Sequence, residues 1–359
     1  MAQKSRYILV INPGSTSTKL AVFSEETQVF SKTARHAAEE LSKCGSTMQQ
    51  LQLRKDAVLA ALAEWDLHEG RFAAVIGRGG LLKPLKSGTY SINQCMLQDL
   101  SNSRYGEHAS NLGALIAHEI ASRGSIPAYI TDPVVVDEMD EIARITGVPE
   151  IKRKSIFHAL NHKAVGRRAA KALGKDYMEA NLVIAHLGGG ITVAAHRLGS
   201  VVDVNDGLFG DGPMSAERAG RLPTGPLIDM CFSGSLTLKD VKRKLVGFGG
   251  LAAYFGTNDA VEIEKRIASG DSNAELVYKA CAYQVSKDIA SCCAVLEGEV
   301  DAIILTGGLA HSDLLTGWIA KRVGFLAKIM VFPGEDEMLA MAEAACRVLR
   351  GEEQVLEYI

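Results

Sequence analysis

The motif NPGSTSTK, which begins at Asn12, combines the backbone and side chains that a phosphate group requires. Gly14 allows the backbone to approach a ligand closely. Ser15, Ser17 and Lys19 alternate, so we expect their side chains to project from one side of an extended chain. Hydroxyls donate to phosphate oxygens, lysine supplies a positive charge, and the Asn12 amide could orient a phosphate or a water. The same motif also fits a polar hairpin turn with a solvated lysine.

Two familiar phosphate-binding motifs do not fit this chain. A P-loop needs GxxxxGK[ST] followed by a helix, whereas no glycine lies between Gly14 and Lys19, and the residues that follow, LAVF, read as a strand. A dinucleotide fingerprint needs a helix after its glycines, whereas Gly190 is followed by the strand-like ITVAA. We therefore predict that the donors to phosphate are the amides and hydroxyls of a hairpin turn.

Two further glycine loops follow apolar strands, LGGG at 187–190 and TGGLAHS at 306–312. Their glycines are Gly188, Gly189, Gly190, Gly307 and Gly308. One such loop is a weak signal because glycines close turns everywhere. Three in this order suggest two hairpins that contact phosphate and one loop at the nucleoside, a layout that resembles the actin, Hsp70 and sugar-kinase superfamily of ATP-binding folds.

The elements that must position these loops occur twice. Strand-like runs at 6–11 and 18–23 flank the first loop, and segment 181–204 reads as strand, glycine loop, strand, turn and strand. Further strands are expected at 72–77, 126–130, 301–308 and 328–332, and helices at 37–65 (interrupted near Cys44 and Gly45), 107–123, 155–173 (with Ser155 as a plausible N-cap), 238–246, 259–268, 273–297, 312–323 and 335–351.

This repetition predicts an α/β chain with a duplicated, actin-like (ribonuclease H-like) two-domain fold and the ligand in an interdomain cleft. We expect an N-terminal α/β domain over residues 1–150 and a C-terminal nucleotide-binding α/β domain over 151–334. The C-terminal segment 335–359 is expected to pack back on the first domain.

Several motifs together resemble the acetate and butyrate kinase family. NPGSTSTK is similar to the family's opening, FHALNHK at 157–163 resembles its FHGTSHK segment, and HLGGG, ERAG and TGGLAHS follow in family order. LGGG in place of LGNG, GEDE at 334–337 and the shorter chain point to the butyrate kinase branch. The resemblance implies reversible ATP-dependent phosphorylation of a short-chain fatty acid, butyrate or a branched relative, to its acyl phosphate. It also implies ATP/ADP and Mg²⁺ as cofactors, and a homo-oligomer.

The resemblance assigns catalytic roles to four residues. Arg78, which follows the strand FAAVIG, matches the family arginine that holds the substrate carboxylate or the transferred phosphoryl group. Arg218 matches the second family arginine, although Arg221 lies close enough to be confused with it. His158 corresponds to the histidine proposed to donate to the phosphoryl group. Asp132, at a strand end, is a Mg²⁺ partner or an orienting carboxylate.

The remaining assignments concern the metal and the nucleotide. Glu337 is our choice for the family's magnesium-linked acid, with Asn12 beside the metal, but Glu335 lies within reach of a register error. The alternative for Glu337 is ordinary acid enrichment in a first helical turn. His186 is assigned to the nucleotide. His162, four residues after the first histidine of FHALNHK, either supports that histidine or forms a metal pair with it.

Composition limits the function classes. Lys and Arg total 39 and Asp and Glu total 42, a balance that gives no support to nucleic-acid binding as the main task. Seven cysteines without CxxC or Cys/His metal spacing predict reduced thiols in a cytoplasmic protein. No apolar run approaches the length of a membrane span, so we expect no membrane partner.

Two other functions fit the same ATPase fold. A kinase of another small carboxylate or of a sugar is one, although a hydroxyl substrate would usually require a carboxylate as general base rather than a pair of arginines. An actin- or Hsp70-like nucleotide switch is the other, and it would hydrolyse ATP slowly without a small acceptor.

Overall fold

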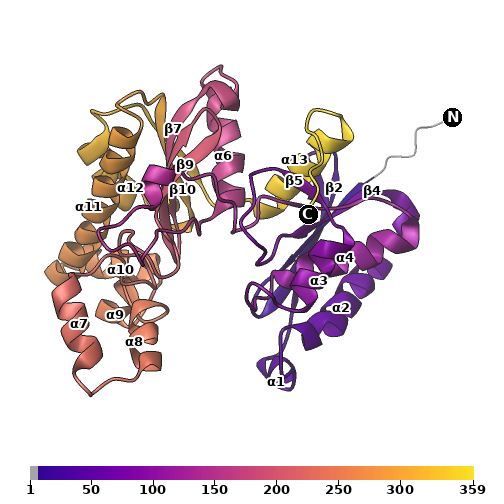
Figure 1. Cartoon of the computed structure of the whole chain (residues 1–359), viewed down its shortest axis with the longest axis horizontal. Coiled ribbons are helices and arrows are strands. Elements are labelled where there is room, and N and C mark those ends of the chain that lie inside the picture. Colours follow the sequence, from indigo (N-terminus) through magenta and orange to yellow (C-terminus); the bar gives the residue numbers. More distant parts are fainter. Residues whose placement is uncertain (1–6) are drawn as a thin grey trace. The chain divides into compact units, whose positions relative to one another are not determined.

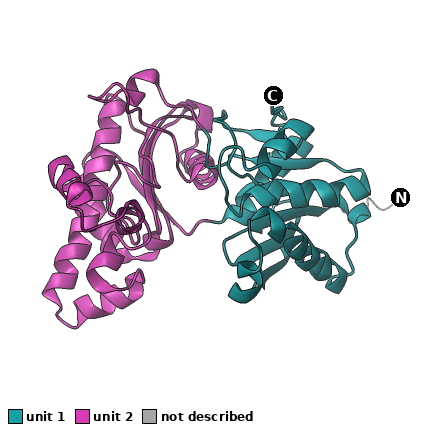
Figure 2. Cartoon of the chain, turned by 60° about the horizontal axis from the view of Figure 1, so that its bottom comes forward, with its two compact units in different colours: residues 1–136, 336–359 teal, residues 137–335 magenta. Residues whose placement is uncertain are grey.

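The computed structural model describes residues 7–359, and its contacts divide the chain into two compact units (Figure 1, Figure 2). Unit 1 is Met1–Val136 with Asp336–Ile359, and unit 2 is Asp137–Glu335. The C-terminal helix therefore belongs to unit 1, although the whole of unit 2 separates it from the rest of unit 1 in the sequence. The domain division expected from the sequence, 1–150 and 151–334, stays a prediction.

Unit 1 is built on a six-stranded sheet with the order β3-β2-β1-β4-β6-β5. Its strands are β1 (Tyr7–Pro13), β2 (Ser17–Ser24), β3 (Thr27–Arg35), β4 (Phe72–Arg78), β5 (Thr89–Ser91) and β6 (Ala128–Thr131). Its helices are α1 (Ala38–Ser42), α2 (Leu51–Glu64), α3 (Gln94–Ser101), α4 (Asn111–Gly124) and α13 (Glu337–Leu349), with short 3-10 turns at Met48–Gln50 and Glu69–Arg71.

Unit 2 is built on a five-stranded sheet with the order β11-β10-β7-β8-β9. Its strands are β7 (Asn181–Leu187), β8 (Ile191–Arg197), β9 (Ser200–Val204), β10 (Ala302–Gly307) and β11 (Ile329–Pro333). Its helices are α5 (Glu141–Arg144), α6 (Ala159–Ala172), α7 (Thr224–Phe232), α8 (Leu238–Leu245), α9 (Leu251–Phe255), α10 (Ala260–Ala268), α11 (Ser272–Val295) and α12 (Asp313–Val323), with 3-10 turns at Tyr177–Glu179 and Gly308–His311.

The two sheets share one topology. In each unit the first strand pairs antiparallel with the second and the second antiparallel with the third. In unit 1, β1 also pairs in parallel with β4, and β4 pairs in parallel with β6. In unit 2, β7 likewise pairs in parallel with β10, and β10 with β11. The strands that correspond are β1, β2, β3, β4 and β6 in unit 1 and β7 to β11 in unit 2. The hairpin around a glycine loop thus opens both units, as the sequence pattern predicts.

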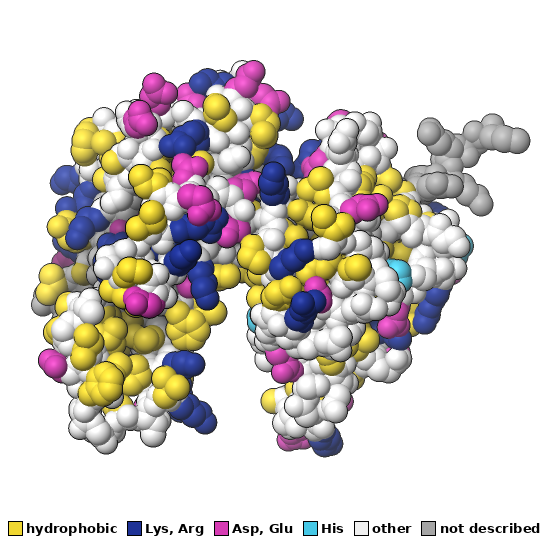
Figure 3. Space-filling model, in the orientation of Figure 1, with side chains coloured by type: hydrophobic (Ala, Val, Ile, Leu, Met, Phe, Trp, Pro, Cys, Tyr) yellow, Lys and Arg dark blue, Asp and Glu magenta, His cyan; other side chains and the backbone are white. Residues whose placement is uncertain are grey.

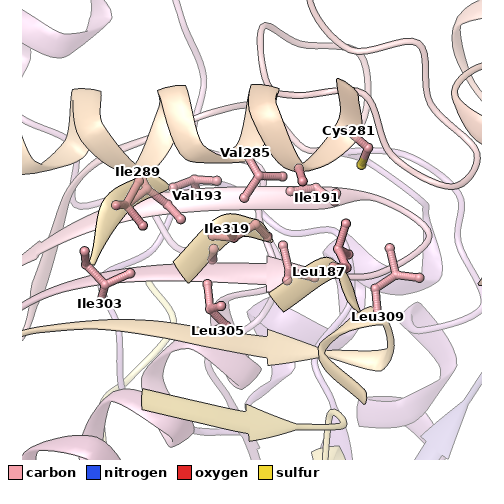
Figure 4. Close-up of a cluster of buried hydrophobic side chains, with 14 of the residues drawn as sticks. Leu187, Ile191, Val193, Cys281, Val285, Ile289, Ile303, Leu305, Leu309 and Ile319 are labelled. Atoms are coloured by element: carbon pink, nitrogen blue, oxygen red, sulfur yellow. The ribbon is translucent and has the colours of Figure 1, made fainter. Parts of the chain in front are cut away.

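The core of unit 2 lies between its sheet and the long helix α11. Figure 4 shows Val285 and Ile289 of α11 pointing toward Ile191 and Val193 of β8, and all four side chains are at most 2% exposed. Alternate residues of β8 face this core because successive side chains of a strand point to opposite faces. The opposite face therefore remains for other side chains of β8, which include Thr192.

In unit 1, α4 packs closely against the end of β4, where Arg78 lies. A Cβ atom on Gly77 would lie 2.2 Å from the carbonyl oxygen of Gly113, and one on Gly113 would lie 2.4 Å from that of Arg78. Only a pair of glycines permits this approach of helix to strand. The position of Arg78 is therefore fixed by backbone packing.

Some elements differ from those expected. The helical stretch over 37–65 is interrupted near Cys44 and Gly45 as expected, and its first part is only the short helix α1, followed by a 3-10 turn and α2. The helix expected from Ser155 begins at Ala159, with His158 at its N-cap, so the prediction of Ser155 as the cap was wrong. Helix α7 was not predicted, because none of its residues is buried and its sequence lacks a periodic apolar stripe.

The mixture of charges on the surface and the hydrophobicity of the helices agree with the composition. On the face drawn in Figure 3, basic and acidic side chains are interspersed over each unit. Within residues 7–359, no helix is both long and apolar enough to cross a membrane.

Candidate active site

The first glycine hairpin joins β1 to β2. Asn12 lies opposite Lys19 in the antiparallel register, and the Gly14 amide donates to the Ser17 carbonyl at 2.8 Å to close the turn. Ser15 and Lys19 are exposed, whereas Thr18 between them is fully buried. The alternation expected from the sequence is therefore present within β2, where Ser17 and Lys19 flank Thr18, but not in the turn before it, where Ser15 and Thr16 are both exposed.

A buried arginine that the sequence analysis missed supports this hairpin from inside. Arg54 of α2 is fully buried and donates to the carbonyl oxygens of Ser15 at 3.1 Å and Ser17 at 2.8 Å. It also donates to the Thr18 hydroxyl at 3.2 Å and to Oε1 of Gln50. Burial lowers the pKa of Arg54. Its contacts shape the turn that the sequence assigns to phosphate.

Arg78, Glu337 and Asn12 meet at the carboxyl ends of β1 and β4. Nη1 of Arg78 lies 2.9 Å from Oε1 of Glu337, an ion pair whose angle does not make a hydrogen bond. Nδ2 of Asn12 donates to Oε2 of Glu337 at 2.7 Å. One carboxylate therefore contacts both the predicted substrate arginine and the predicted metal-linked asparagine.

The loop after Arg78 is held by Asn111 at the start of α4. Oδ1 of Asn111 accepts from the Leu81 amide at 2.8 Å, and its Nδ2 donates to the Gly106 carbonyl at 2.9 Å. His108, on the same approach to α4, contacts the Ser110 hydroxyl at 2.8 Å. Burial, followed by the charge of Arg78, lowers the pKa of His108.

Asp132 lies in a turn rather than at the ion pair described above. Its Oδ1 accepts from the Ser87 hydroxyl at 2.6 Å and from the Gly88 amide at 2.9 Å, and the residue is 2% exposed. Its φ of 38° falls in the left-handed region, which costs energy for a residue with a Cβ. These contacts give Asp132 a structural task, and its predicted catalytic role stays a prediction.

The second glycine hairpin, between β7 and β8, lies beneath Arg218. A Cβ atom on Gly190 would lie 2.6 Å from Nη1 of Arg218, so the guanidinium rests against a glycine that it requires. The Arg218 amide donates to the Ser215 hydroxyl, which itself donates to the Gly189 carbonyl at 2.6 Å. Burial lowers the pKa of Arg218, and its Nε is buried without a hydrogen-bond partner among residues 7–359.

Arg221, which the sequence could not separate from Arg218, has a different environment. Its Nη1 lies 3.2 Å from Oδ1 of Asp288 on α11. The ion pair ties Arg221 to a helix of the core, so Arg218 is the arginine at the triple glycine.

Two predicted histidines of unit 2 stack on each other. The rings of His158 and His186 lie 3.8 Å apart at an interplanar angle of 11°. Nδ1 of His186 donates to Oδ1 of Asn161 at 2.8 Å, because the amide nitrogen of Asn161 donates elsewhere, to the Glu335 carbonyl. Nε2 of His186 lies 3.4 Å from Oε1 of Glu335. Glu335 therefore contacts His186, whereas Glu337 contacts Arg78.

The third glycine loop begins at the end of β10. Gly307 has φ of 89°, and a Cβ there would lie 2.5 Å from the Leu187 carbonyl oxygen, so only glycine fits. Gly307 and Gly334 exchange backbone hydrogen bonds of 3.0 Å. The space around a Cβ on Gly308 is open, which leaves room for a ligand next to the loop.

The alternative of a metal pair at His158 and His162 gains no support. Among residues 7–359, no group of three or more His, Cys, Asp or Glu side chains is arranged to hold a metal ion. Both histidines instead contact the hydroxyl of Thr192, at 3.0 and 2.9 Å. The zinc alternative considered from their spacing therefore lacks a third ligand.

Comparisons with known proteins bear on the family and on the fold. A family model described as the Acetokinase family matches residues 147–315. The chain is 51% identical over 351 residues to Butyrate kinase 2 of Clostridium acetobutylicum, and the match covers 98% of this chain and 99% of that relative. The chain belongs to the acetokinase family. The family resemblance predicted from the motifs is confirmed.

Solved structures extend the comparison of this acetokinase family member to its fold. An acetate kinase from Porphyromonas gingivalis matches with a TM-score of 0.78 at 18% identity, over 96% of this chain and 100% of that one. A propionate kinase from Francisella tularensis matches with a TM-score of 0.75 at 20% identity, over 94% and 98%. These likenesses bear on the fold alone, and the predicted duplicated actin-like ATPase fold is confirmed.

Proposed function

We propose that this acetokinase family member transfers the γ-phosphoryl group of ATP to the carboxylate of a short-chain fatty acid, giving ADP and an acyl phosphate, reversibly. The observation that carries the proposal is the 51% identity, over almost the full length of both chains, to a relative named Butyrate kinase 2. The reaction joins two anions, so cationic side chains must neutralise charge where they meet.

In unit 1, Arg78 binds the substrate carboxylate. A guanidinium suits this task because its planar fork donates to two oxygens at once. In the structure Arg78 already contacts one carboxylate, that of Glu337, and its side chain is only 14% exposed. A substrate carboxylate forms a strong pair with a guanidinium that is so little exposed to water.

Glu337 and Asn12 are the residues that would hold Mg²⁺ with the nucleotide. Mg²⁺ takes hard oxygen ligands and usually keeps several waters beside one or two carboxylates and phosphate oxygens. The pair fits this ligand set, because Glu337 provides a carboxylate and Asn12 an amide oxygen, held together by a hydrogen bond. The ion would supply charge neutralisation at the phosphates. Arg78 orients the Glu337 carboxylate through its other oxygen, Oε1.

In unit 2, Arg218 and His158 act on the phosphoryl group. The buried Nε of Arg218, which has no hydrogen-bond partner among residues 7–359, is a donor in want of an acceptor. A phosphoryl oxygen meets that need. His158 donates to a second oxygen, with its ring oriented by His186 and by the Thr192 hydroxyl.

The glycine hairpins and His186 bind the nucleotide. The Gly189 amide, with the side chains of Ser15, Ser17 and Lys19, provides donors to phosphate oxygens, while Gly14 allows the backbone to approach them closely. The loop at Gly307 and Gly308 lies beside the nucleoside, where the open space at Gly308 permits close approach.

The acid is short but not narrowly defined. Each CH₂ added to an apolar niche contributes about 0.8 kcal/mol, roughly a factor of four in binding. We therefore expect propionate, butyrate and branched C4–C5 acids to differ by modest factors in kcat/KM.

A hydroxamate assay tests the proposal. Purified protein with ATP, Mg²⁺, hydroxylamine and each acid from C2 to C6 should yield acyl hydroxamate, with a maximum near C4. Arg78→Ala should lower kcat about 100-fold while circular dichroism stays unchanged. No hydroxamate from any of these acids, together with turnover of a sugar in a parallel panel, would replace the proposal by a sugar kinase.

Two further assignments follow the family resemblance. We propose a homo-oligomer, which light scattering at several protein concentrations tests. We also propose a cytoplasmic location, which is supported by seven cysteines that are all free thiols. Fractionation of cells that express the tagged chain tests it.

A further inference from the structure

Five side chains of unit 2 form an unbroken hydrogen-bonded chain that ends at His158. The Tyr177 hydroxyl lies 2.8 Å from Nδ1 of His196, and Nε2 of His196 lies 3.3 Å from Nδ1 of His162. Nε2 of His162 lies 2.9 Å from the Thr192 hydroxyl, which lies 3.0 Å from Nδ1 of His158. Each imidazole in the middle uses both of its nitrogens within this chain.

The chain is buried almost throughout. Thr192, His162 and His196 are fully buried, and Tyr177 is 7% exposed. Burial lowers the pKa of both His162 and His196 well below 6.5, and nearby charges add to this, among them that of Lys163. Both rings are therefore neutral near pH 7, and each has one nitrogen that donates and one that accepts.

This alternation couples the direction of all the hydrogen bonds. If Tyr177 donates to Nδ1 of His196, then Nε2 of His196 must carry its proton and donate to Nδ1 of His162. Nε2 of His162 then donates to Thr192, whose own proton goes to Nδ1 of His158. A neutral His158 must in turn carry its proton on Nε2. The reverse direction would place that proton on Nδ1.

The chemistry of the first group selects between the two directions. A phenol is a stronger acid than a neutral imidazole, so the favoured hydrogen bond runs from the Tyr177 hydroxyl to the His196 nitrogen. Two cations reinforce the position of the Tyr177 ring, since Arg167 and Lys163 lie 5.4 and 5.9 Å from its centroid. Lys163 is itself paired with Glu138 at 2.5 Å.

We propose that Tyr177, acting through His196, His162 and Thr192, is a positioning residue that holds His158 in the tautomer with its proton on Nε2. The inference rests on the proposed function, in which His158 donates to a phosphoryl oxygen. In the other tautomer Nε2 is an acceptor, and its lone pair would face a negatively charged oxygen. The stacking of His158 on His186 at 3.8 Å fixes the plane of the ring, and the hydrogen-bonded chain fixes its proton.

Nuclear magnetic resonance tests the tautomer without any enzymatic activity. Protein labelled with ¹⁵N at its nine histidines is compared with His158→Gln to assign the His158 signals. The expected wild-type spectrum has a protonated, pyrrole-type Nε2 and an accepting, pyridine-type Nδ1. Tyr177→Phe should give averaged signals from both tautomers. A wild-type His158 protonated on Nδ1, or identical signals in Tyr177→Phe, would overturn the proposal.

Kinetics test the consequence. Tyr177→Phe and Thr192→Val should each lower kcat for hydroxamate formation about tenfold, with KM for ATP and for the acid unchanged. Thr192→Ser, which keeps the hydroxyl, should restore kcat to within about twofold of wild type. Tyr278→Phe is a matched control, because Tyr278 is a fully buried tyrosine of the same unit whose hydroxyl donates to Glu264 instead.

The outcomes separate this proposal from the proposed function. If no C2–C6 acid is phosphorylated but the wild-type proton lies on Nε2 and depends on Tyr177, the function fails and the positioning chain stands. If acids are phosphorylated and Thr192→Val equals Thr192→Ser in kcat, the positioning role is wrong although the enzyme is a kinase. A fall in kcat with Tyr278→Phe as large as that with Tyr177→Phe also counts against it.

Discussion

Nη1 of Arg78 lies 2.9 Å from Oε1 of Glu337, while Nδ2 of Asn12 donates to Oε2 of the same carboxylate. These residues come from β4, the start of α13 and β1, so the fold brings the last helix of the chain to its first strand. Glu337 therefore balances the charge of Arg78 while it orients Asn12. A change of this carboxylate should disturb both the proposed substrate arginine and the proposed metal ligands.

Glu337→Gln should raise the Mg²⁺ concentration required for half-maximal activity about tenfold and lower kcat. The amide keeps the shape of the side chain but removes the charge that balances Arg78 and that, in the proposed function, attracts the metal. The measurement is a Mg²⁺ titration of hydroxamate formation at saturating ATP and butyrate.

Glu335→Gln is the matched control for this prediction. The sequence left both acids open, but in the structure Glu335 lies beside His186 and not beside Arg78. Its Mg²⁺ dependence should stay within about twofold of wild type. The reverse result, in which Glu335→Gln alone changes the Mg²⁺ titration, would move the metal assignment to Glu335.

Gly190→Ala should lower kcat by about 10–100-fold without unfolding the protein. Its Cβ would lie 2.6 Å from Nη1 and 2.9 Å from Cζ of Arg218, so the guanidinium must move away from the hairpin. Misplacement of a charged donor by an ångström removes much of its effect on the transition state. Steady-state kinetics with butyrate, together with thermal melting, provide the measurement.

Gly189→Ala separates this effect from crowding of the nucleotide. A Cβ on Gly189 would make ordinary contacts of 3.6 and 3.8 Å with Glu217, so Arg218 need not shift. Gly189→Ala should therefore change KM for ATP more than kcat. Equal losses of kcat in the two variants would show that the effect of Gly190→Ala does not arise from a shift of Arg218.

The sequence predicts the strands, the glycine hairpins and the repeated order of both units because these features are local. An apolar run, a turn residue and the next apolar run lie together in the chain, as around Gly14 and Gly190. The place of Arg78 at a strand end is equally local, since it directly follows the apolar run FAAVIG, whereas its predicted role comes from the resemblance to the family. Its contact with Glu337 was not predicted, because that pairing depends on where a distant helix packs.

Arg54 and Tyr177 were missed for a different reason. Arg54 shares a helical face with Val58, Ala61 and Leu62, and this spacing predicts burial. An arginine in an apolar stripe is usually interpreted as exposed, because a buried guanidinium requires several hydrogen-bond acceptors. Tyr177 lies in a short 3-10 turn without periodicity, and only the tertiary fold brings it to His196.

Arg54→Met should lower the free energy of unfolding by about 3 kcal/mol and raise KM for ATP. The change leaves the carbonyls of Ser15 and Ser17 without their buried donor, and each unsatisfied acceptor costs about 1–3 kcal/mol. Urea unfolding measures the first effect, and ATP titration the second. Arg35→Met, at an exposed arginine of β3, should leave both quantities near wild type. Loss of stability with an unchanged KM would mean that Arg54 does not shape the nucleotide hairpin.

Stability should fall as the pH drops below about 6.5, and His162 and His196 should account for much of the slope. Burial lowers the pKa of both groups in the folded protein, whereas in the unfolded chain they titrate near the ordinary value. The unfolded chain therefore binds more protons in this range, so the stabilisation is complete above the unfolded pKa and is lost below it. Each histidine contributes up to about 1.4 kcal/mol per pH unit.

Urea unfolding between pH 5.5 and 7.5 should show a smaller slope for His196→Gln than for wild type, whereas His68→Gln, at an exposed histidine, should match wild type. Equal slopes for wild type and His196→Gln would mean that His196 binds its proton at the same pH in the folded and the unfolded protein, which would contradict the burial of a neutral ring in the hydrogen-bonded chain from Tyr177 to His158.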